Sequence, residues 1–241
     1  MDLLANAAWH ALTGPQAPIA QGGDLAVRFD PDVSVFAALP DRPSPGAWDA
    51  LAELVGPGNP TALIRVDLDP PPDWTELFAG VGVQMAWPGG PLDGSPPDGF
   101  EAIRLTADDV PEMVALVART EPGPFADRTI ELGTYLGVRD PVDGALVAMA
   151  GQRLRPPGHV EISAVCTDVA FRGRGLARWL VELLIEDISG RGDVAILHAA
   201  ATNTGAVRLY RAMGFVTVRE LRFAALRAPG RPVVTDQPVI G

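Results

Sequence analysis

The chain has 241 residues, of which 47% are hydrophobic, and a formal net charge of −11. All 19 basic residues are arginines, so the chain lacks the lysine that a pyridoxal phosphate Schiff base or a Walker A loop requires. Its single cysteine, Cys166, excludes an internal disulfide and a zinc site built from several thiolates.

The negative charge lies mostly in the first part of the chain. Residues 1–98 carry three arginines and 13 acidic residues, whereas residues 99–241 carry 16 and 17. Because an acidic surface repels phosphates, we expect no nucleic-acid partner. No apolar run reaches bilayer length and the N-terminus lacks a signal-peptide pattern, so no membrane association and a cytoplasmic location are expected.

The first 87 residues are predicted to form an accessory α/β half without a recognisable catalytic motif. The hydrophobic pattern predicts strands at 24–29, 33–39, 62–68 and 82–87, and helices at 47–55 and 74–79. Residues 88–99, PGGPLDGSPPDG, contain four prolines and four glycines, which predicts a linker. If this linker is a domain boundary, a fragment without residues 1–98 should still bind its ligand.

The chain from residue 100 to 226 is predicted to form the second domain, followed by a tail at 227–241. Strands are expected at 101–105, 145–154, 159–167, 194–199, 215–218 and 220–225. Helices are expected from the N-cap Thr106 to 118, at 129–136, from the loop after 171 to about 188, and at 204–213. This order predicts an α+β fold with a mixed, largely antiparallel sheet and helices on both faces.

The segment VAFRGRGLARWL, Val169 to Leu180, places two glycines and two arginines before an amphipathic helix. A helix N-terminus presents unpaired N–H groups and partial positive charge. Gly173 and Gly175 would let a bulky anion approach this backbone, and Arg172 and Arg174 add formal charge. The segment is not the dinucleotide fingerprint, since Arg178 stands where the third glycine belongs. A tight strand-to-helix turn would explain the glycines equally well.

Residues 172–177, RGRGLA, match the pattern R/Q-x-x-G-x-G/A, which resembles the acyl-coenzyme A loop of the GNAT superfamily of N-acetyltransferases. EISAVCT at 161–167 resembles the family's fourth strand, and NTGAVRLYRAMGF at 203–215 resembles its N-x-x-A-x-x-L-Y-x-x-x-G-F segment. The similarity covers about residues 99–226 and is greatest to the branch of glycine N-acyltransferase-like enzymes. Val169 stands where a proline is common. The first half could then be a degenerate GNAT-like copy.

The resemblance implies roles for three groups of residues. The backbone of Arg172, Gly173, Arg174, Gly175, Leu176 and Ala177 would bind the coenzyme A pyrophosphate. Val165, Cys166 and Thr167 would contact the thioester and pantetheine through backbone groups, and Asn203 would contact the pantetheine or phosphate arm. Tyr210 would protonate the leaving thiolate, and Glu161 would be the general base.

Each of these roles has a structural alternative. Asn203 also fits a helix N-cap, Tyr210 a half-buried aromatic, and Glu161 an ordinary strand residue. As a base, Glu161 would need burial in the cleft to raise its pKa towards about 6–7. Catalysis by Cys166 is disfavoured, because a lone strand cysteine is usually just buried. His198 is expected to be a satisfied histidine in the core or at the cleft edge, with a general base as the alternative.

The acceptor is expected to enter beside TEPGPFADR at 120–128, where Phe125 would either line the pocket or anchor the loop. The predicted activity is direct transfer of an acetyl group from acetyl-CoA to the primary amine of a small molecule or peptide, without a metal. The alternatives are transfer of a longer acyl chain and a catalytically silent acyl-CoA-binding module. The protein is expected to be a monomer or homodimer.

Overall fold

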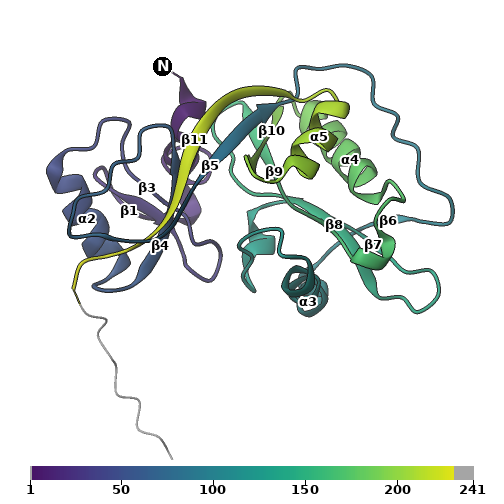
Figure 1. Cartoon of the computed structure of the whole chain (residues 1–241), viewed down its shortest axis with the longest axis horizontal. Helices are drawn as coiled ribbons and strands as arrows, with labels where there is room; N and C mark the ends of the chain where they lie inside the picture. Colours follow the sequence, from purple (N-terminus) through teal and green to yellow (C-terminus); the bar gives the residue numbers. More distant parts are fainter. Residues whose placement is uncertain (1, 231–241) are drawn as a thin grey trace, which may run out of the picture.

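A mixed eight-stranded sheet runs through most of the molecule (Figure 1). The structure is a computed structural model that describes residues 2–230. The strand order is β4-β11-β5-β10-β9-β8-β7-β6, and only the β9–β10 pair is parallel. A second sheet has the order β1-β2-β3. The predicted α+β class with a largely antiparallel sheet is confirmed.

The elements before the predicted linker are η1 (Leu3–Asn6), α1 (Ala7–Leu12), η2 (Ala17–Ile19), β1 (Ala20–Gly22), β2 (Val27–Phe29), β3 (Ala37–Ala38), α2 (Pro45–Val55), β4 (Pro60–Arg65) and β5 (Thr75–Ala86). The elements after it are β6 (Ala102–Arg104), η3 (Ala107–Asp109), α3 (Val110–Thr120), η4 (Thr129–Leu132), β7 (Tyr135–Arg139), β8 (Leu146–Gln152), β9 (His159–Thr167), η5 (Val169–Phe171), α4 (Leu176–Gly190), β10 (Val194–Ala200), α5 (Thr204–Ala212) and β11 (Val216–Arg227).

The helix predicted at 74–79 is wrong, because this segment begins the long strand β5. β5 pairs with β11 along nearly its whole length and with β10 near its end. In Figure 1, β5 and β11 lie side by side and join the part of the molecule that holds α2 to the part that holds α3–α5. Cross-strand pairing with β11 outweighs the weak local preference of this short apolar segment.

Strand β5 also bears on the predicted division at the linker. It precedes the linker in sequence but lies between β10 and β11, which follow it. The two parts of the chain therefore share one sheet. The division into an accessory half and an acetyltransferase domain stays a prediction that a deletion can test.

The predicted linker packs against the protein. The indole N–H of Trp179 donates to the carbonyl of Gly94 at 3.1 Å, and the N–H of Gly94 donates to Glu182 at 3.1 Å. Both partners are on α4. Pro97 lies 3.9 Å from the position that a Cβ would take at Gly175. These contacts hold the segment along α4 as far as the loop that precedes this helix.

Helices cover both faces of the sheet, as predicted. Alternate residues of β8 point to opposite faces, so Ala148 and Ala150 join the cluster that contains α4, whereas Met149 joins the cluster under α3. Leu180 and Leu184 of α4 are fully buried against this sheet. Each such side chain stabilises the fold by roughly 1.5–3 kcal/mol relative to an exposed one.

Other element boundaries differ in detail from the prediction. The helix expected at 129–136 is the 3₁₀ turn η4 followed by strand β7, and the two last predicted strands form one strand, β11, with a register shift between Thr217 and Arg219. Helix α1 was not predicted. Residues 231–241 of the predicted tail lie outside the described residues. Between residues 2 and 230, no helix has both the length and the hydropathy to cross a membrane.

Candidate active site

A cavity of about 1040 Å³ opens where β9 and β10 diverge. The two strands pair from His159 to Ile162, and the residues that follow on each strand line the cavity. Ala164 has φ +52°, in the left-handed region, and the β8–β9 register shifts next to it. This bulge lies where β9 and β10 stop pairing and diverge. Such strain in a non-glycine residue is typical of functional sites.

The loop before α4 has the backbone expected of an anion site. Gly173 and Gly175 have φ +79° and +81°, a conformation that costs other residues about 1–2 kcal/mol. The carboxylate of Asp168 accepts from the N–H of Ala170 at 3.1 Å and from Arg119 at 2.7 Å. The hydrogen bond from Arg119 holds the pKa of Asp168 below its usual range. The loop leads directly into the first turn of α4, where the backbone N–H groups have no carbonyl acceptor within the helix.

The cavity brings together most of the residues that the motifs singled out. Its lining includes Val165, Cys166, Thr167, Arg172, Gly173, Gly175, Leu176, Ala177, Asn203 and Tyr210. Arg174 and Glu161 are not among the lining residues. The guanidinium of Arg174 lies over the ring of Phe171 at 4.8 Å and over that of Phe100 at 6.0 Å. Arg172 forms no ion pair with any residue in the described range 2–230.

Tyr210 lies on α5 and is buried against the edge of Phe215, with ring centroids 5.8 Å apart. Burial raises the pKa of Tyr210 to about 12, and the nearby Cys166 adds to this effect. The phenol therefore keeps its proton at neutral pH, as a proton donor must. Burial also raises the pKa of the Cys166 thiol, which makes it a poor nucleophile.

Glu161 lacks the raised pKa that a general base would need here. This side chain is 0% exposed and lies beneath the cavity rather than in its wall. Burial alone would raise the pKa of Glu161, but the charge of Arg153 and the hydrogen bonds from His198 and Arg153 outweigh burial and lower it. The carboxylate accepts two hydrogen bonds from Arg153, at 2.6 and 2.9 Å, and one from His198 Nδ1 at 2.7 Å. A carboxylate held in this way is a weak proton acceptor.

His198, in contrast, lines the cavity, and both of its ring nitrogens have partners. Nε2 lies 2.8 Å from the amide nitrogen of Gln84, which also donates to the carbonyl of Leu4. Because an amide nitrogen only donates, Nε2 is the acceptor and Nδ1 donates its proton to Glu161. The network joins β5, β9 and β10 beneath the cavity.

The N-cap role of Asn203 is confirmed, since its side-chain oxygen accepts from the N–H of Ala206 at 3.1 Å. The expected acceptor loop is at the cavity from Thr120 to Pro124. Phe125 is not in the lining but packs edge-on against Tyr135, with centroids 5.8 Å apart. The anchoring alternative for Phe125 is therefore confirmed.

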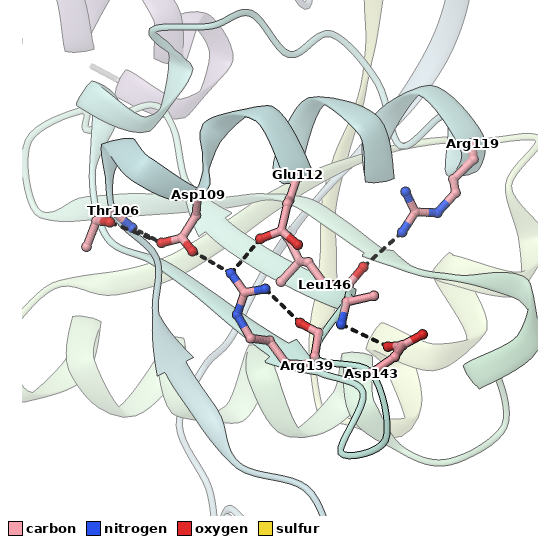
Figure 2. Close-up of polar contacts among 9 residues, drawn as sticks. Thr106, Asp109, Glu112, Arg119, Arg139, Asp143 and Leu146 are labelled. Carbon is pink, nitrogen blue, oxygen red and sulfur yellow. Dashed lines mark hydrogen bonds and ion pairs between the residues drawn. The ribbon is translucent and has the colours of Figure 1, made fainter.

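Helix α3 places this loop at the cavity. Figure 2 shows Arg139 of β7 between Asp109 and Glu112, with N–O distances of 2.6 Å to each carboxylate. The Asp109 carboxylate also accepts from the N–H of Thr106 at 2.8 Å, in the predicted capping position. At the other end of α3, Arg119 donates to the carbonyl of Leu146 at 2.9 Å. Both ends of α3 are thus tied to the β7–β8 region.

The far end of the cavity was not predicted. It is lined by Phe36, Ala62, Ile64 and Phe78 from the first half and by Phe223 and Ala225 from β11. A sequence pattern alone does not show that strands β4 and β5 face the site. Only the pairing of β4 and β5 with β11 brings these side chains to it.

A glycine loop at a helix N-terminus beside a cavity between diverging strands fits the acyl-coenzyme A site that the sequence resemblance implies. The comparisons with known proteins agree. The model of the FR47-like protein family matches residues 135–224. The N-alpha-acetyltransferase RimI of Mycobacterium tuberculosis is 36% identical over 125 residues, which are 47% of this chain and 77% of that protein. The [Ribosomal protein bS18]-alanine N-acetyltransferase of Salmonella typhimurium is 25% identical over 141 residues, which are 56% of this chain and 95% of that protein.

A crystal structure of a GNAT-family acetyltransferase from Novosphingobium aromaticivorans has a TM-score of 0.84 and 36% identity, and it covers 96% of this chain and 99% of that one. The likeness includes the first half as well as the second. The chain belongs to the GNAT family of N-acetyltransferases and is an acyltransferase.

Proposed function

We propose that the protein transfers an acetyl group from acetyl-CoA directly to a primary amine of a small molecule or peptide. The observation that carries this proposal is one cavity whose lining includes the loop at 172–177, Tyr210 and the apolar side chains of the far end. Two substrates entering from opposite ends would meet between β9 and β10. The two curated relatives are both named as N-acetyltransferases, which supports an amine as acceptor.

Coenzyme A would occupy the end of the cavity that the glycine loop forms. The backbone N–H groups of Gly173, Gly175 and the first turn of α4 would bind the pyrophosphate, with Arg172 as the adjacent positive charge. The backbone of residues 165–167 and the side chain of Asn203 would flank the pantetheine arm. Arg174, which lies on aromatic rings, would contribute its charge at longer range.

In the transfer step, the neutral amine nitrogen attacks the thioester carbonyl carbon and forms a tetrahedral oxyanion, which N–H groups of β9 would stabilise. The carbon–sulfur bond then breaks, and Tyr210 donates its proton to the departing thiolate. On forming the amide the nitrogen releases one proton to solvent water in the cavity, and the Tyr210 phenolate takes one proton back from the same solvent, so the products are the amide and the free thiol. We do not assign that proton to Glu161, because this carboxylate is buried and its pKa is lowered. Glu161 instead positions Arg153 and His198.

The test is release of free coenzyme A from acetyl-CoA that depends on an added amine, measured over a panel of small amines and peptides. Acceptor-dependent release with an acetylated product supports the proposal. Acetyl-, propionyl- and benzoyl-CoA compared with one acceptor separate acetyl transfer from transfer of a longer chain. Tight binding of acetyl-CoA without release for any amine would favour the silent binding module.

A further inference from the structure

The far end of the cavity has a wall of apolar side chains that all lie on one face of the sheet. In the register of β11, Phe223 is paired with Ile64 of β4 and with Gly80 of β5, and Ala225 is paired with Ala62 and Phe78. Paired residues of antiparallel strands point to the same face. Ala62, Ile64, Phe78, Phe223 and Ala225 therefore form one surface, hereafter the aromatic wall, and all five line the cavity.

The glycines of β5 make room for the aromatic wall. A Cβ at Gly82 would lie 2.9 Å from the ring of Phe223, and a Cβ at Gly80 would lie 3.3 Å from it. The Phe223 ring thus lies over the bare backbone of β5. It stacks on Phe78, with centroids 6.0 Å apart and ring planes at 26°. Phe78 remains 58% exposed, so an aromatic face stays open to whatever enters the cavity.

The charged groups near the aromatic wall are already paired. The Arg153 guanidinium is held by Glu161 and lies over the Phe36 ring at 4.7 Å. His198 is held between Glu161 and Gln84. Among the described residues that line the cavity, Glu121 in the loop after α3 is the one carboxylate. A polycation could therefore pair with only one carboxylate of the described cavity lining, whereas an apolar group could pack against the aromatic wall.

We propose that the aromatic wall is the acceptor subsite and takes an apolar group of aromatic size attached to the reacting amine. This inference rests on the proposed acetyl transfer and specifies its acceptor class. An arylalkylamine and a peptide with an apolar N-terminal side chain share this chemistry. Amines that carry several charges are disfavoured, because the free energy needed to desolvate unpaired charges exceeds the favourable free energy of contact with the aromatic wall.

The test measures binding and turnover with four probes: 2-phenylethylamine, a tetrapeptide beginning with phenylalanine, ethanolamine and spermidine. Binding to the protein saturated with coenzyme A is measured by calorimetry, and acetyl transfer is measured by coenzyme A release. We expect either or both of the first two probes to bind and react at least tenfold better than the last two. The preferred probe of the first two identifies the source of the apolar amine.

Two variants of β5 make the test specific to the wall. Phe78→Ser should raise the KM of the preferred aromatic probe about tenfold, because it removes an aromatic contact, and should leave the KM of acetyl-CoA unchanged. Leu77→Ser is the matched control: Leu77 is 45% exposed on the same strand but is not in the cavity lining. This variant should keep both KM values.

The outcomes separate this inference from the proposed function. Aromatic probes that bind but are not acetylated would leave the subsite in place and overturn the transferase proposal. A preference for spermidine or ethanolamine, or equal effects of Phe78→Ser and Leu77→Ser, would overturn the subsite and leave acetyl transfer standing. Absence of binding by both aromatic probes would also overturn the subsite.

Discussion

Replacement of Gly173 by alanine tests the assignment of the glycine loop to coenzyme A. A Cβ at Gly173 would have no atom within 4 Å, so the change creates no clash inside the protein. Its φ of +79° costs an alanine about 1–2 kcal/mol. If the loop of the variant relaxes to a negative φ, coenzyme A binding must restore the strained backbone, which lowers the affinity. If the loop keeps its backbone, the added methyl group stands on the loop that would hold the pyrophosphate and hinders its approach. A loss of 1–2 kcal/mol corresponds to a dissociation constant about 5- to 30-fold higher.

The matched control for this experiment is Gly158→Ala. Gly158 has φ +72°, has no atom within 4 Å of its Cβ position, and lies in the β8–β9 turn outside the cavity lining. Both variants should lose similar thermal stability in a melting experiment. Only Gly173→Ala should lose affinity for coenzyme A in calorimetry. A folded Gly173→Ala protein whose dissociation constant stays within twofold of the wild type would refute the loop assignment.

Three further predictions follow from the same structure. Tyr210→Phe keeps the ring packing and removes the proton donor, so coenzyme A affinity should hold while kcat falls at least about 10²-fold; an unchanged rate, with chemistry shown to be rate-limiting, would remove the general-acid role. Glu161→Gln leaves the buried Arg153 without its counter-charge and should lower the free energy of unfolding by about 3–5 kcal/mol in urea titrations. The pKa of Glu161 is lowered in the folded state, so the stabilisation by its carboxylate is complete above the ordinary glutamate pKa of 4.5 and is lost as the pH falls below that value. The difference in unfolding free energy between wild type and variant should therefore narrow in acid. A difference that stays constant with pH would contradict this. A fragment of residues 99–241 lacks β4 and β5, the partners of β11, and should be insoluble or unfolded. A soluble fragment that binds coenzyme A would instead support the domain boundary at the linker.

Local sequence determined the parts of the site that lie within one segment of chain. The Arg172–Ala177 loop, the N-caps Thr106 and Asn203, and the helix that begins at Leu176 all depend on backbone preferences and short-range hydrogen bonds. These features act over a few residues, so residue type and spacing are enough to predict them. The same holds for the alternating order of strands and helices that indicated the α+β class.

Tertiary structure alone decided the features that depend on partners distant in sequence. The local pattern gives a weak helical preference at 74–79, but β11 pairs with this segment and makes it a strand. Glu161 is a charged strand residue in the sequence, and its lowered pKa comes from Arg153 and from His198, 37 residues away. The aromatic wall likewise unites β4, β5 and β11 across more than 150 residues of chain. Strand pairing and burial are set by which segments meet in space, and no local pattern encodes that meeting.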